Sequence, residues 1–119
     1  MERIIEQSKE MKKLLILVIA GLALPAWMAS AEEAKAIYEK NCAKCHGADG
    51  AGQTKMGQKL GVKNYTDAKV QAALKDEEMA KAIKEGVKDK EGKTVMKPTE
   101  GVSDADVKGL VTLIRGFKK

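Results

Sequence analysis

Cys42-Ala43-Lys44-Cys45-His46 is the stretch of sequence that decides the fold of this chain. Two cysteines at this spacing can add to the two vinyl groups of one haem, and the histidine that follows them can bind the iron. The same spacing also allows a thioredoxin-like redox pair or half of a zinc site. A redox pair is expected in a βαβ setting, and a zinc site built from Cys and His needs two further ligands, whereas the chain has two cysteines and one histidine. The motif therefore predicts one covalent haem c, attached through Cys42 and Cys45, with His46 as a ligand of the iron.

The first 31 residues have the three parts of a secretory signal peptide. Two lysines precede an almost wholly apolar run, Leu14–Ala26, and the small residues Ala29-Ser30-Ala31 then offer a cleavage site. The run contains Pro25 and is shorter than the ~20 residues that span a bilayer, so we expect no permanent membrane anchor. An uncleaved signal, which would tether the domain, is the alternative. These features predict a signal peptide over 1–31 and export to the periplasm.

Residues 1–10 precede a second methionine, Met11, that begins a better signal sequence. Our hypothesis is that these ten residues reflect a misassigned start codon, and mass spectrometry of the N-terminal peptide of the precursor would test it. Residues 32–119 are enough chain for one small domain and too little for two cores. We expect this domain to be a monomer.

Charge and composition do not favour a nucleic-acid partner. The chain has 22 Lys and Arg residues against 17 Asp and Glu residues, a net charge of +5, and only 3% aromatic residues. This modest surplus and the scarcity of aromatic rings do not indicate nucleic-acid binding. After the predicted signal, the aromatic residues are Tyr38, Tyr65 and Phe117, a thin supply for a hydrophobic core. We therefore expect the haem to form the centre of the core and the haem-free protein to be largely unfolded.

The sequence predicts an all-α fold of about four short helices wrapped around the haem. Ala34, Ile37 and Tyr38 recur at helical spacing and place a short first helix that runs directly into Cys42. Residues 47–52 are too rich in glycine for a regular element and suit a chain that wraps closely around a flat ligand.

Capping residues predict the remaining helices. Asp67 and Asp76 are expected to cap a second and a third helix, the third ending at Gly86. Ser103 with Asp106 resembles a capping box, and apolar residues then recur at i, i+3, i+4 and i+7 along a last helix. No strand pattern of useful length is present, and residues 93–95 are too short to count against an all-helical fold.

Three methionines of the predicted domain are candidates for the other axial position of the iron. Met79 lies on an apolar helix stripe, where packing is the favoured interpretation, and Met56 follows so soon after His46 that we expect it to pack at the haem edge. Met96 lies in an irregular stretch, 91–98, far enough along the chain to reach the opposite haem face. A loop methionine ordinarily only packs, but a soft thioether suits iron in a buried apolar site, so we favour Met96 as the ligand.

At this point the chain resembles the small monohaem class I c-type cytochromes of bacterial periplasms. Three motifs carry the resemblance, the first being the most specific: Tyr38–Gly47, then Gly92–Pro98, then Ser103–Val107 with Leu110–Arg115. The resemblance implies a helical fold in which the first and last helices cross beside the haem. It also implies haem attachment at Cys42 and Cys45, a proximal His46 and a distal Met96.

The chain departs from the usual pattern of this family at two places. A proline whose carbonyl accepts a hydrogen bond from the proximal imidazole is often present after the histidine, but residues 53–56 contain none. Another backbone carbonyl can take that part. The last helix often carries an aromatic residue where Leu113 stands, and Phe117, one turn later, is expected to replace it.

The expected ligands favour a soluble one-electron carrier over an enzyme, because electron transfer needs no acid, base or nucleophile. A peroxidase would use a distal histidine-arginine pair, and the sequence shows no such pair. A second hypothesis is a haem-based gas sensor or ligand-binding protein in which Met96 is labile and admits carbon monoxide or nitric oxide. A third is an electron-entry subunit of a larger reductase, which co-purification would reveal.

Redox proteins with an acidic docking face are the expected partners. Several lysines fall in segments expected to frame the haem edge: Lys44, Lys55, Lys59, Lys63, Lys93 and Lys97. Most exposed lysines are simply solvated, and Lys97, next to Met96, is the best candidate for a docking contact.

Overall fold

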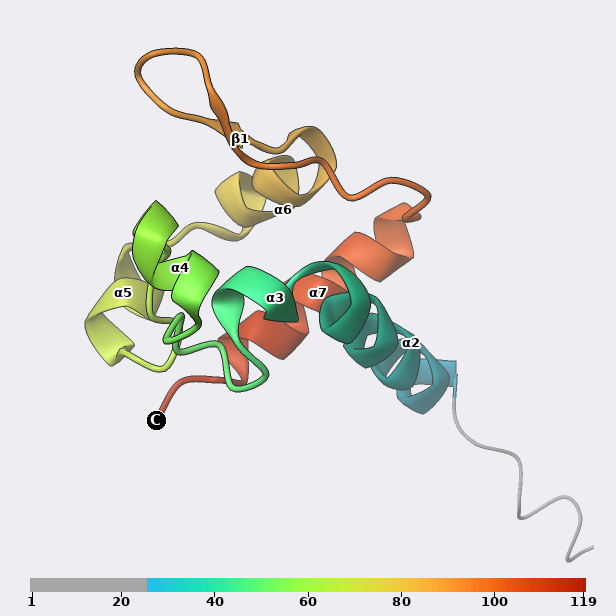
Figure 1. Ribbon diagram of the computed structural model, residues 1–119. Helices are drawn as coiled ribbons and strands as arrows, with labels where there is room; N and C mark the ends of the chain where they lie inside the picture. Colours follow the sequence, from blue (N-terminus) through green and yellow to red (C-terminus); the bar gives the residue numbers. More distant parts are fainter. Residues whose placement is uncertain (1–25) are drawn as a thin grey trace, which may run out of the picture.

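The computed structural model describes residues 26–119, and this part of the chain is mainly helical (Figure 1). Its elements are α2 (Ala26–Asn41), α3 (Ala43–His46), α4 (Lys55–Leu60), α5 (Ala68–Ala73), α6 (Asp76–Glu85), β1 (Val87–Lys88), β2 (Thr94–Met96) and α7 (Asp104–Arg115). Most of the predicted signal peptide, and the whole of its apolar run but the last residue, lies outside the described residues. None of the helices from residue 26 onward is long and apolar enough to cross a membrane.

Helices α2 and α7 form the principal packing contact, and α6 lies against α7 (Figure 1). Ala34 and Tyr38 are the buried residues that α2 contributes, one helical turn apart, as the periodicity predicts. On α7 the buried residues are Val107, Leu110, Val111 and Ile114. Burial of an aliphatic side chain of this size contributes roughly 1.5–3 kcal/mol. The crossing of the first described helix with the last is therefore the main support of the fold, as the family resemblance implies.

Two of the three predicted helix caps are present. The Ser103 hydroxyl accepts from the Asp106 amide at 3.1 Å while the Asp106 carboxylate accepts from the Ser103 amide at 2.9 Å, which completes the capping box of α7. Asp67 caps α5 by accepting from the Lys69 amide at 2.8 Å. The prediction for Asp76 is wrong, because Lys75 is the capping position of α6 and forms no side-chain bond there.

Asp76 instead lies in the first turn of α6, where its carboxylate accepts from Nε of Arg115 at 2.9 Å. This partner is distant in the sequence, so local capping rules do not reveal it. Helix α6 ends at Gly86, as predicted.

The segment expected to be irregular contains a short strand. β1 and β2 pair antiparallel, with Val87 opposite Met96 and Lys88 opposite Thr94. Together with the turn between them they form a small ribbon that projects beyond α6 (Figure 1). Strands of two and three residues carry too little pattern to be recognised from sequence.

Two helical segments exceed the four that were predicted. α3 is the attachment motif itself, wound into a single turn, and α4 is a six-residue helix capped by Thr54. α4 has glycines within and after it, which weakens any sequence signal for a helix. Phe117 does replace the missing aromatic residue, since its ring centroid lies 5.2 Å from that of Tyr38 on α2.

Candidate haem site

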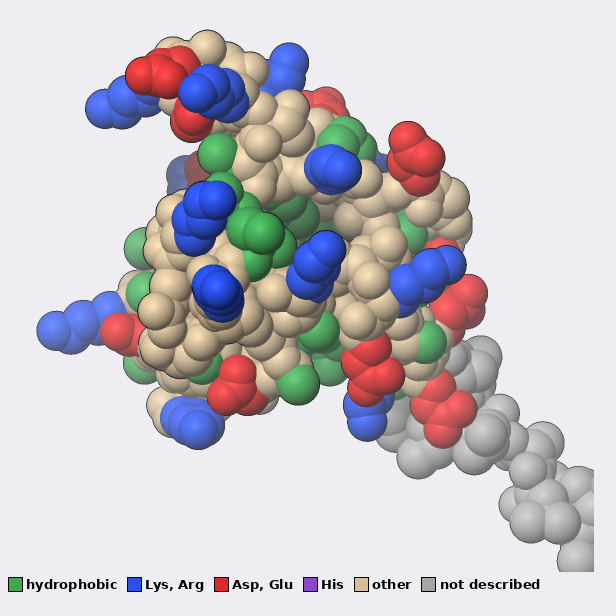
Figure 2. Space-filling view, viewed as in Figure 1, with side chains coloured by type: hydrophobic (Ala, Val, Ile, Leu, Met, Phe, Trp, Pro, Cys, Tyr) green, Lys and Arg blue, Asp and Glu red, His purple; other side chains and the backbone are tan. Residues whose placement is uncertain are grey.

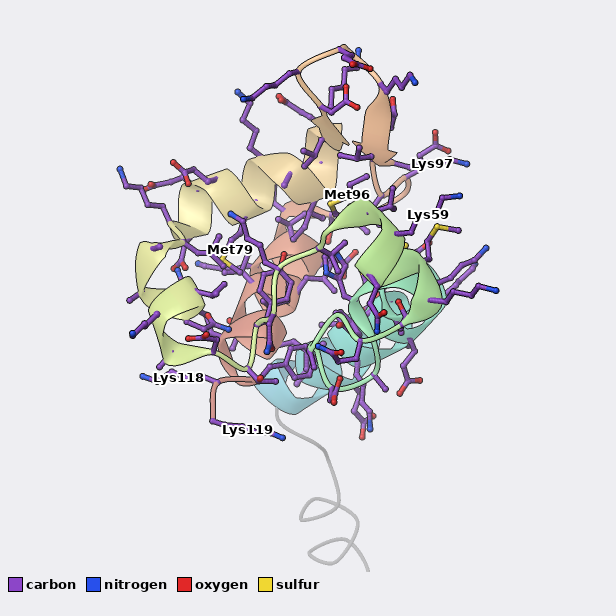
Figure 3. The ribbon with its side chains drawn as sticks, turned by 60° about the vertical axis from the view of Figure 1, so that its left-hand side comes forward. Lys59, Met79, Met96, Lys97, Lys118 and Lys119 are labelled. Atoms are coloured by element: carbon purple, nitrogen blue, oxygen red, sulfur yellow. The ribbon has the colours of Figure 1, made fainter. Side chains whose placement is uncertain are left out.

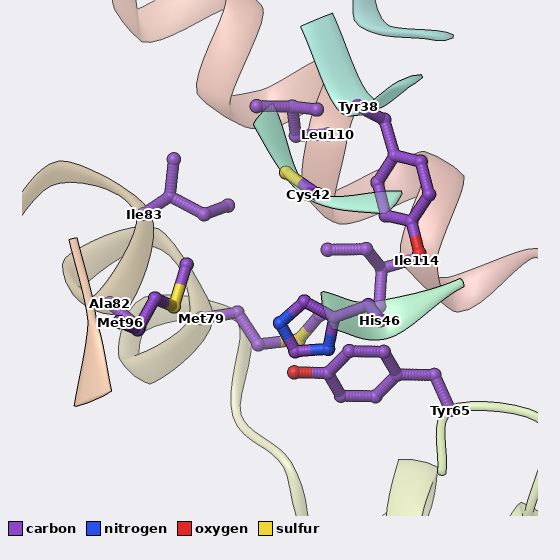
Figure 4. A pocket seen from close by; sticks show the side chains of 10 residues that line it. All are labelled: Tyr38, Cys42, His46, Tyr65, Met79, Ala82, Ile83, Met96, Leu110 and Ile114. Atoms are coloured by element: carbon purple, nitrogen blue, oxygen red, sulfur yellow. The ribbon is translucent and has the colours of Figure 1, made fainter. Parts of the chain in front are cut away.

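One apolar pocket gathers residues from five elements, from the turn at Cys42 and from the loop that holds Tyr65 (Figure 4). The pocket, together with the solvent-open space at its mouth, comprises about 430 Å³ that protein atoms do not fill. Its lining residues are Tyr38, Cys42, His46, Tyr65, Met79, Ala82, Ile83, Met96, Leu110 and Ile114. This set brings together three of the four residues predicted to hold the haem.

His46 is held at the pocket by the turn α3. Its Nδ1 is buried and has no hydrogen-bond partner, so the carbonyl expected to replace the missing proline does not bond to it. Burial lowers the pKa of His46, which favours the neutral imidazole that a metal ligand must be. The imidazole is therefore in the neutral state that can bind iron. Its Nδ1 has no hydrogen-bond partner in the protein.

Both cysteines are free thiols, and they differ in their surroundings. Cys42 is buried, with 8% of its surface exposed, and lines the pocket. Burial, and to a lesser degree the neighbouring Cys45, raises the pKa of Cys42 to about 11. Cys45 is half-buried and is not among the residues that line the pocket. The Cys42 thiol thus lies in the pocket, whereas Cys45 is outside its lining.

Two methionines line the pocket, and Figure 4 shows both side chains directed into it. Met79 has 6% of its surface exposed and belongs to the hydrophobic core cluster, which agrees with the packing that was predicted for it. Met96, at the end of β2, lines the pocket without belonging to that cluster. Met56 is 40% exposed on α4 and does not line the pocket.

Tyr65 is a site residue that the sequence reasoning missed. Its ring stacks on the imidazole of His46, with centroids 5.2 Å apart and an interplanar angle of 26°. Burial, and secondarily Cys42, raises the pKa of Tyr65. The only signal in the sequence is an isolated aromatic residue in a polar loop, which does not distinguish a pocket residue from any other.

Tyr38 connects the pocket to the glycine-rich loop that follows the attachment turn. Its hydroxyl donates to the carbonyl of Gly47 at 2.7 Å in a buried position. The loop then folds back, so that the Gly52 amide donates to the carbonyl of His46 at 2.8 Å. Gly57 lies so close to this turn that an added Cβ would overlap the carbonyl oxygen of Cys45. Position 57 therefore requires glycine, because no side chain fits there. That residues 47–52 wrap around a flat ligand stays a prediction.

The residues of the pocket suit a haem. A neutral imidazole, a thioether and an apolar lining with one thiol in it, and a second thiol three residues along the chain, are groups that a c-type haem uses. Over residues 26–119 no three His, Cys, Asp or Glu side chains gather into a group that could hold a metal ion. A zinc site of the Cys/His class therefore has no ligand set in that range.

Comparison with known proteins agrees with this assignment. Residues 31–118 match the family model described as Cytochrome c. The fold is similar to a solved structure described as the KustC0563 c-type cytochrome, with 37% sequence identity and a TM-score of 0.60, covering 72% of this chain and 98% of that one. A tyrosine-to-phenylalanine mutant of Kustc0563 matches with 34% identity and a TM-score of 0.58, covering 72% of this chain and 99% of the mutant. A search of curated protein sequences found no match.

The family model covers the whole region that contains the pocket, the attachment motif and the last helix. Proteins of this family generally transfer electrons, and they carry haem covalently. The chain belongs to the cytochrome c family and is a small class I c-type cytochrome that binds one covalent haem c.

Proposed function

We propose that this cytochrome is a periplasmic one-electron carrier whose haem is attached through Cys42 and Cys45 and whose iron is bound by His46 and Met96. One observation carries the ligand assignment. His46 and Met96 are far apart in the sequence, yet they line the same apolar pocket. The signal-peptide pattern of residues 1–31 supports the periplasmic location.

The bound haem supplies one-electron chemistry through the ferric and ferrous states of its iron. His46 contributes a neutral nitrogen donor, and Met96 contributes a soft thioether that favours the ferrous state. The apolar side chains around them exclude water and disfavour extra charge, which raises the reduction potential further. Because both ligands come from the protein, electron transfer requires little rearrangement of the chain.

Partner docking is proposed to use a basic surface around the pocket. In Figure 2, Lys and Arg side chains surround hydrophobic atoms at the centre of the visible face. The six lysines proposed for the haem edge are all exposed, and in Figure 3 Lys59 and Lys97 extend outward beside Met96. Such a surface would steer an acidic redox partner towards the haem edge.

The steering proposal is tested by the ionic strength dependence of electron transfer with an acidic redox protein. We expect the second-order rate constant to fall as salt is raised, because screening weakens attraction between exposed charges. Lys97→Gln is expected to reduce this dependence more than Lys90→Gln, which changes an exposed lysine of the distal turn of the ribbon. A rate constant that does not change with salt would contradict the steering proposal.

Axial ligation is tested by visible and near-infrared spectra of the exported protein in both redox states. We expect a sulfur-to-iron charge-transfer band in the oxidised protein, its loss in Met96→Ala, and its retention in the matched controls Met79→Leu and Met56→Leu. A band that survives in Met96→Ala and disappears in Met79→Leu would move the sulfur ligand to α6. Five-coordinate ferrous iron that binds carbon monoxide rapidly in the unaltered protein would favour the gas-sensor hypothesis instead.

A further inference from the structure

The geometry points to Gly86 as the residue that positions Met96 in the haem pocket. Gly86 follows the last residue of α6 and precedes β1, so it lies where the helix meets the ribbon that carries Met96. The inference rests on the proposed ligation by Met96 and adds the reason why its side chain reaches the pocket.

The backbone of Gly86 has a conformation that only glycine adopts readily. Its φ is +76° and its ψ is −175°, while its amide donates to the carbonyl of Ala82 at 2.8 Å and closes the last turn of α6. In this region of backbone space a Cβ atom is strained by steric contact with its own peptide groups. The conformation turns the chain from α6 directly into β1.

Contact between Gly86 and the far end of the ribbon is closer than any side chain would permit. A Cβ added at Gly86 would overlap the carbonyl oxygen of Met96 and would lie 2.9 Å from both the nitrogen and the Cδ of Pro98. Two of these three are backbone atoms, and the third belongs to a rigid ring, so none can rotate away. An added methyl group must therefore displace the backbone at Met96 or the end of α6.

A second contact fixes the same segment. The amide of Thr99, which is buried with 8% of its surface exposed, donates to the carbonyl of Ile83 at 2.9 Å. Met96 also pairs with Val87 in the ribbon. The backbone of residues 96–99 is thus held on both sides against the C-terminal end of α6.

Helix α6 forms the wall of the pocket next to Met96. Met79, Ala82 and Ile83 of this helix line the pocket together with Met96 (Figure 4). Since the Met96 backbone rests on the helix end, the distance from that backbone to the helix determines how far the thioether extends into the pocket. The absence of a side chain at Gly86 sets that distance to its smallest value.

Gly92 offers a matched control in the same ribbon. It also has a positive φ, +83°, but a Cβ added there would meet nothing within 4 Å. Gly92→Ala therefore also places a Cβ atom at a residue with positive φ, but without contact with Met96. A difference between Gly86→Ala and Gly92→Ala separates a side chain that overlaps the Met96 segment from a side chain that meets open space.

The test uses the haem-loaded Gly86→Ala, Gly92→Ala and Met96→Ala proteins. We measure the near-infrared sulfur-to-iron band of the oxidised form, the reduction potential and carbon monoxide binding by the reduced form. For Gly86→Ala we expect a weaker band, a lower potential and an about tenfold larger fraction open to carbon monoxide, which corresponds to about 1.4 kcal/mol at the ligand. For Gly92→Ala we expect all three to match the unaltered protein.

Failure of this inference and failure of the proposed ligation give different results. A band that persists in Met96→Ala shows that Met96 is not the ligand and removes the proposed ligation. A band lost in Met96→Ala but unchanged in Gly86→Ala, with unchanged potential and carbon monoxide binding, overturns the positioning role alone. Equal losses in Gly86→Ala and Gly92→Ala overturn it as well.

Far-ultraviolet circular dichroism of the same samples shows whether the helices persist. If Gly86→Ala loses its helices, Thr99→Pro provides the test, since proline lacks the amide that bonds to Ile83 and leaves Gly86 unchanged. A weakened band with normal helix content in Thr99→Pro supports the anchoring of residues 96–99 on α6. An unaltered band in that variant overturns it.

Discussion

Thr54 joins the haem-attachment turn to the next helix with a single hydroxyl group. Its Oγ1 donates to the carbonyl of Cys45 at 2.6 Å and accepts from the amide of Gly57 at 2.9 Å. The first bond satisfies a carbonyl of the attachment turn, and the second caps α4. The residue thus fixes α4 against the segment that carries Cys45.

Thr54→Val should lower the free energy of unfolding of the haem-loaded protein by roughly 1–2 kcal/mol, because both hydrogen bonds are lost while the shape is kept. Thr54→Ser retains the hydroxyl and should remain close to the unaltered protein. Denaturant unfolding followed by circular dichroism measures the difference. Equal stability of the two variants would show that these bonds do not stabilise the fold.

At the scale of elements, Arg115 at the end of α7 holds the connection between α5 and α6. Its guanidinium donates to the carbonyl of Leu74 at 2.7 Å, to Oε1 of Gln71 at 3.1 Å and to Asp76. Gln71, which is buried with 4% exposed, donates in turn to the carbonyls of Tyr65 and Ile114 at 2.7 and 2.8 Å. This network links the haem-site loop to the last helix.

Arg115→Lys should destabilise the protein by about 2 kcal/mol, because an ammonium group cannot donate to the separate acceptors that the planar guanidinium reaches. Asp76→Asn removes only the ion pair with Arg115. Because the Asp76 side chain is 70% exposed, this substitution should lower the free energy of unfolding by less than about 1 kcal/mol. Denaturant unfolding of both variants separates the two contributions. If both variants lost the same free energy of unfolding, the ion pair would be the stabilising interaction, and the bonds to backbone carbonyls would not.

A second link between elements depends on pH. Lys84 of α6 donates to the carboxylate of Asp104 in the first turn of α7, and this hydrogen bond, with the charge of Lys84, lowers the pKa of Asp104 below its ordinary value of 3.8. A lowered folded-state pKa adds stability that is present above the unfolded pKa and is lost as pH falls through the folded one.

Asp104→Asn should therefore be less stable than the unaltered protein at pH 7, and the difference should narrow as pH falls below 3.8. The carboxylate is fully exposed, so added salt should also narrow the difference at pH 7. Thermal unfolding at several pH values and two ionic strengths measures both trends. If the stability difference between Asp104→Asn and the unaltered protein did not change with pH, it would come from packing and not from the charge of Asp104.

At the scale of the whole molecule, the haem pocket occupies the centre of a small core. Leu110 is the only large side chain with less than 2% exposure in the described part of the chain, and it borders the pocket. Two aromatic residues, Tyr38 and Tyr65, line this space, and Phe117 packs against the core beside Tyr38. A core of this size buries little apolar surface unless the pocket is filled.

The double variant Cys42→Ala, Cys45→Ala, which cannot attach haem by thioethers, should be largely unfolded. Folding and haem binding are linked, so a ligand that binds only the folded state stabilises it. We expect a narrow amide region in its NMR spectrum and weak helical circular dichroism. Well-dispersed amide signals would show that the protein core is sufficient without the cofactor.

Several features follow from the sequence by itself because they depend on neighbouring residues. The attachment motif, the capping box at Ser103, the cap at Asp67 and the end of α6 at Gly86 are local patterns that can be read from a few neighbouring residues. The apolar periodicity of the last helix likewise fixes which of its faces is buried. These features determine a helical domain with one haem attachment site.

Other features were decided only by the tertiary structure, because they arise between segments that the sequence separates. The pairing of Val87 with Met96, the stacking of Tyr65 on His46 and the bonds of Arg115 join residues that no local rule connects. Short elements such as β2 gain little free energy alone and form where such contacts hold them. The sequence alone therefore predicted where the haem attaches, because that motif is local, whereas tertiary packing decided which side chains line the pocket.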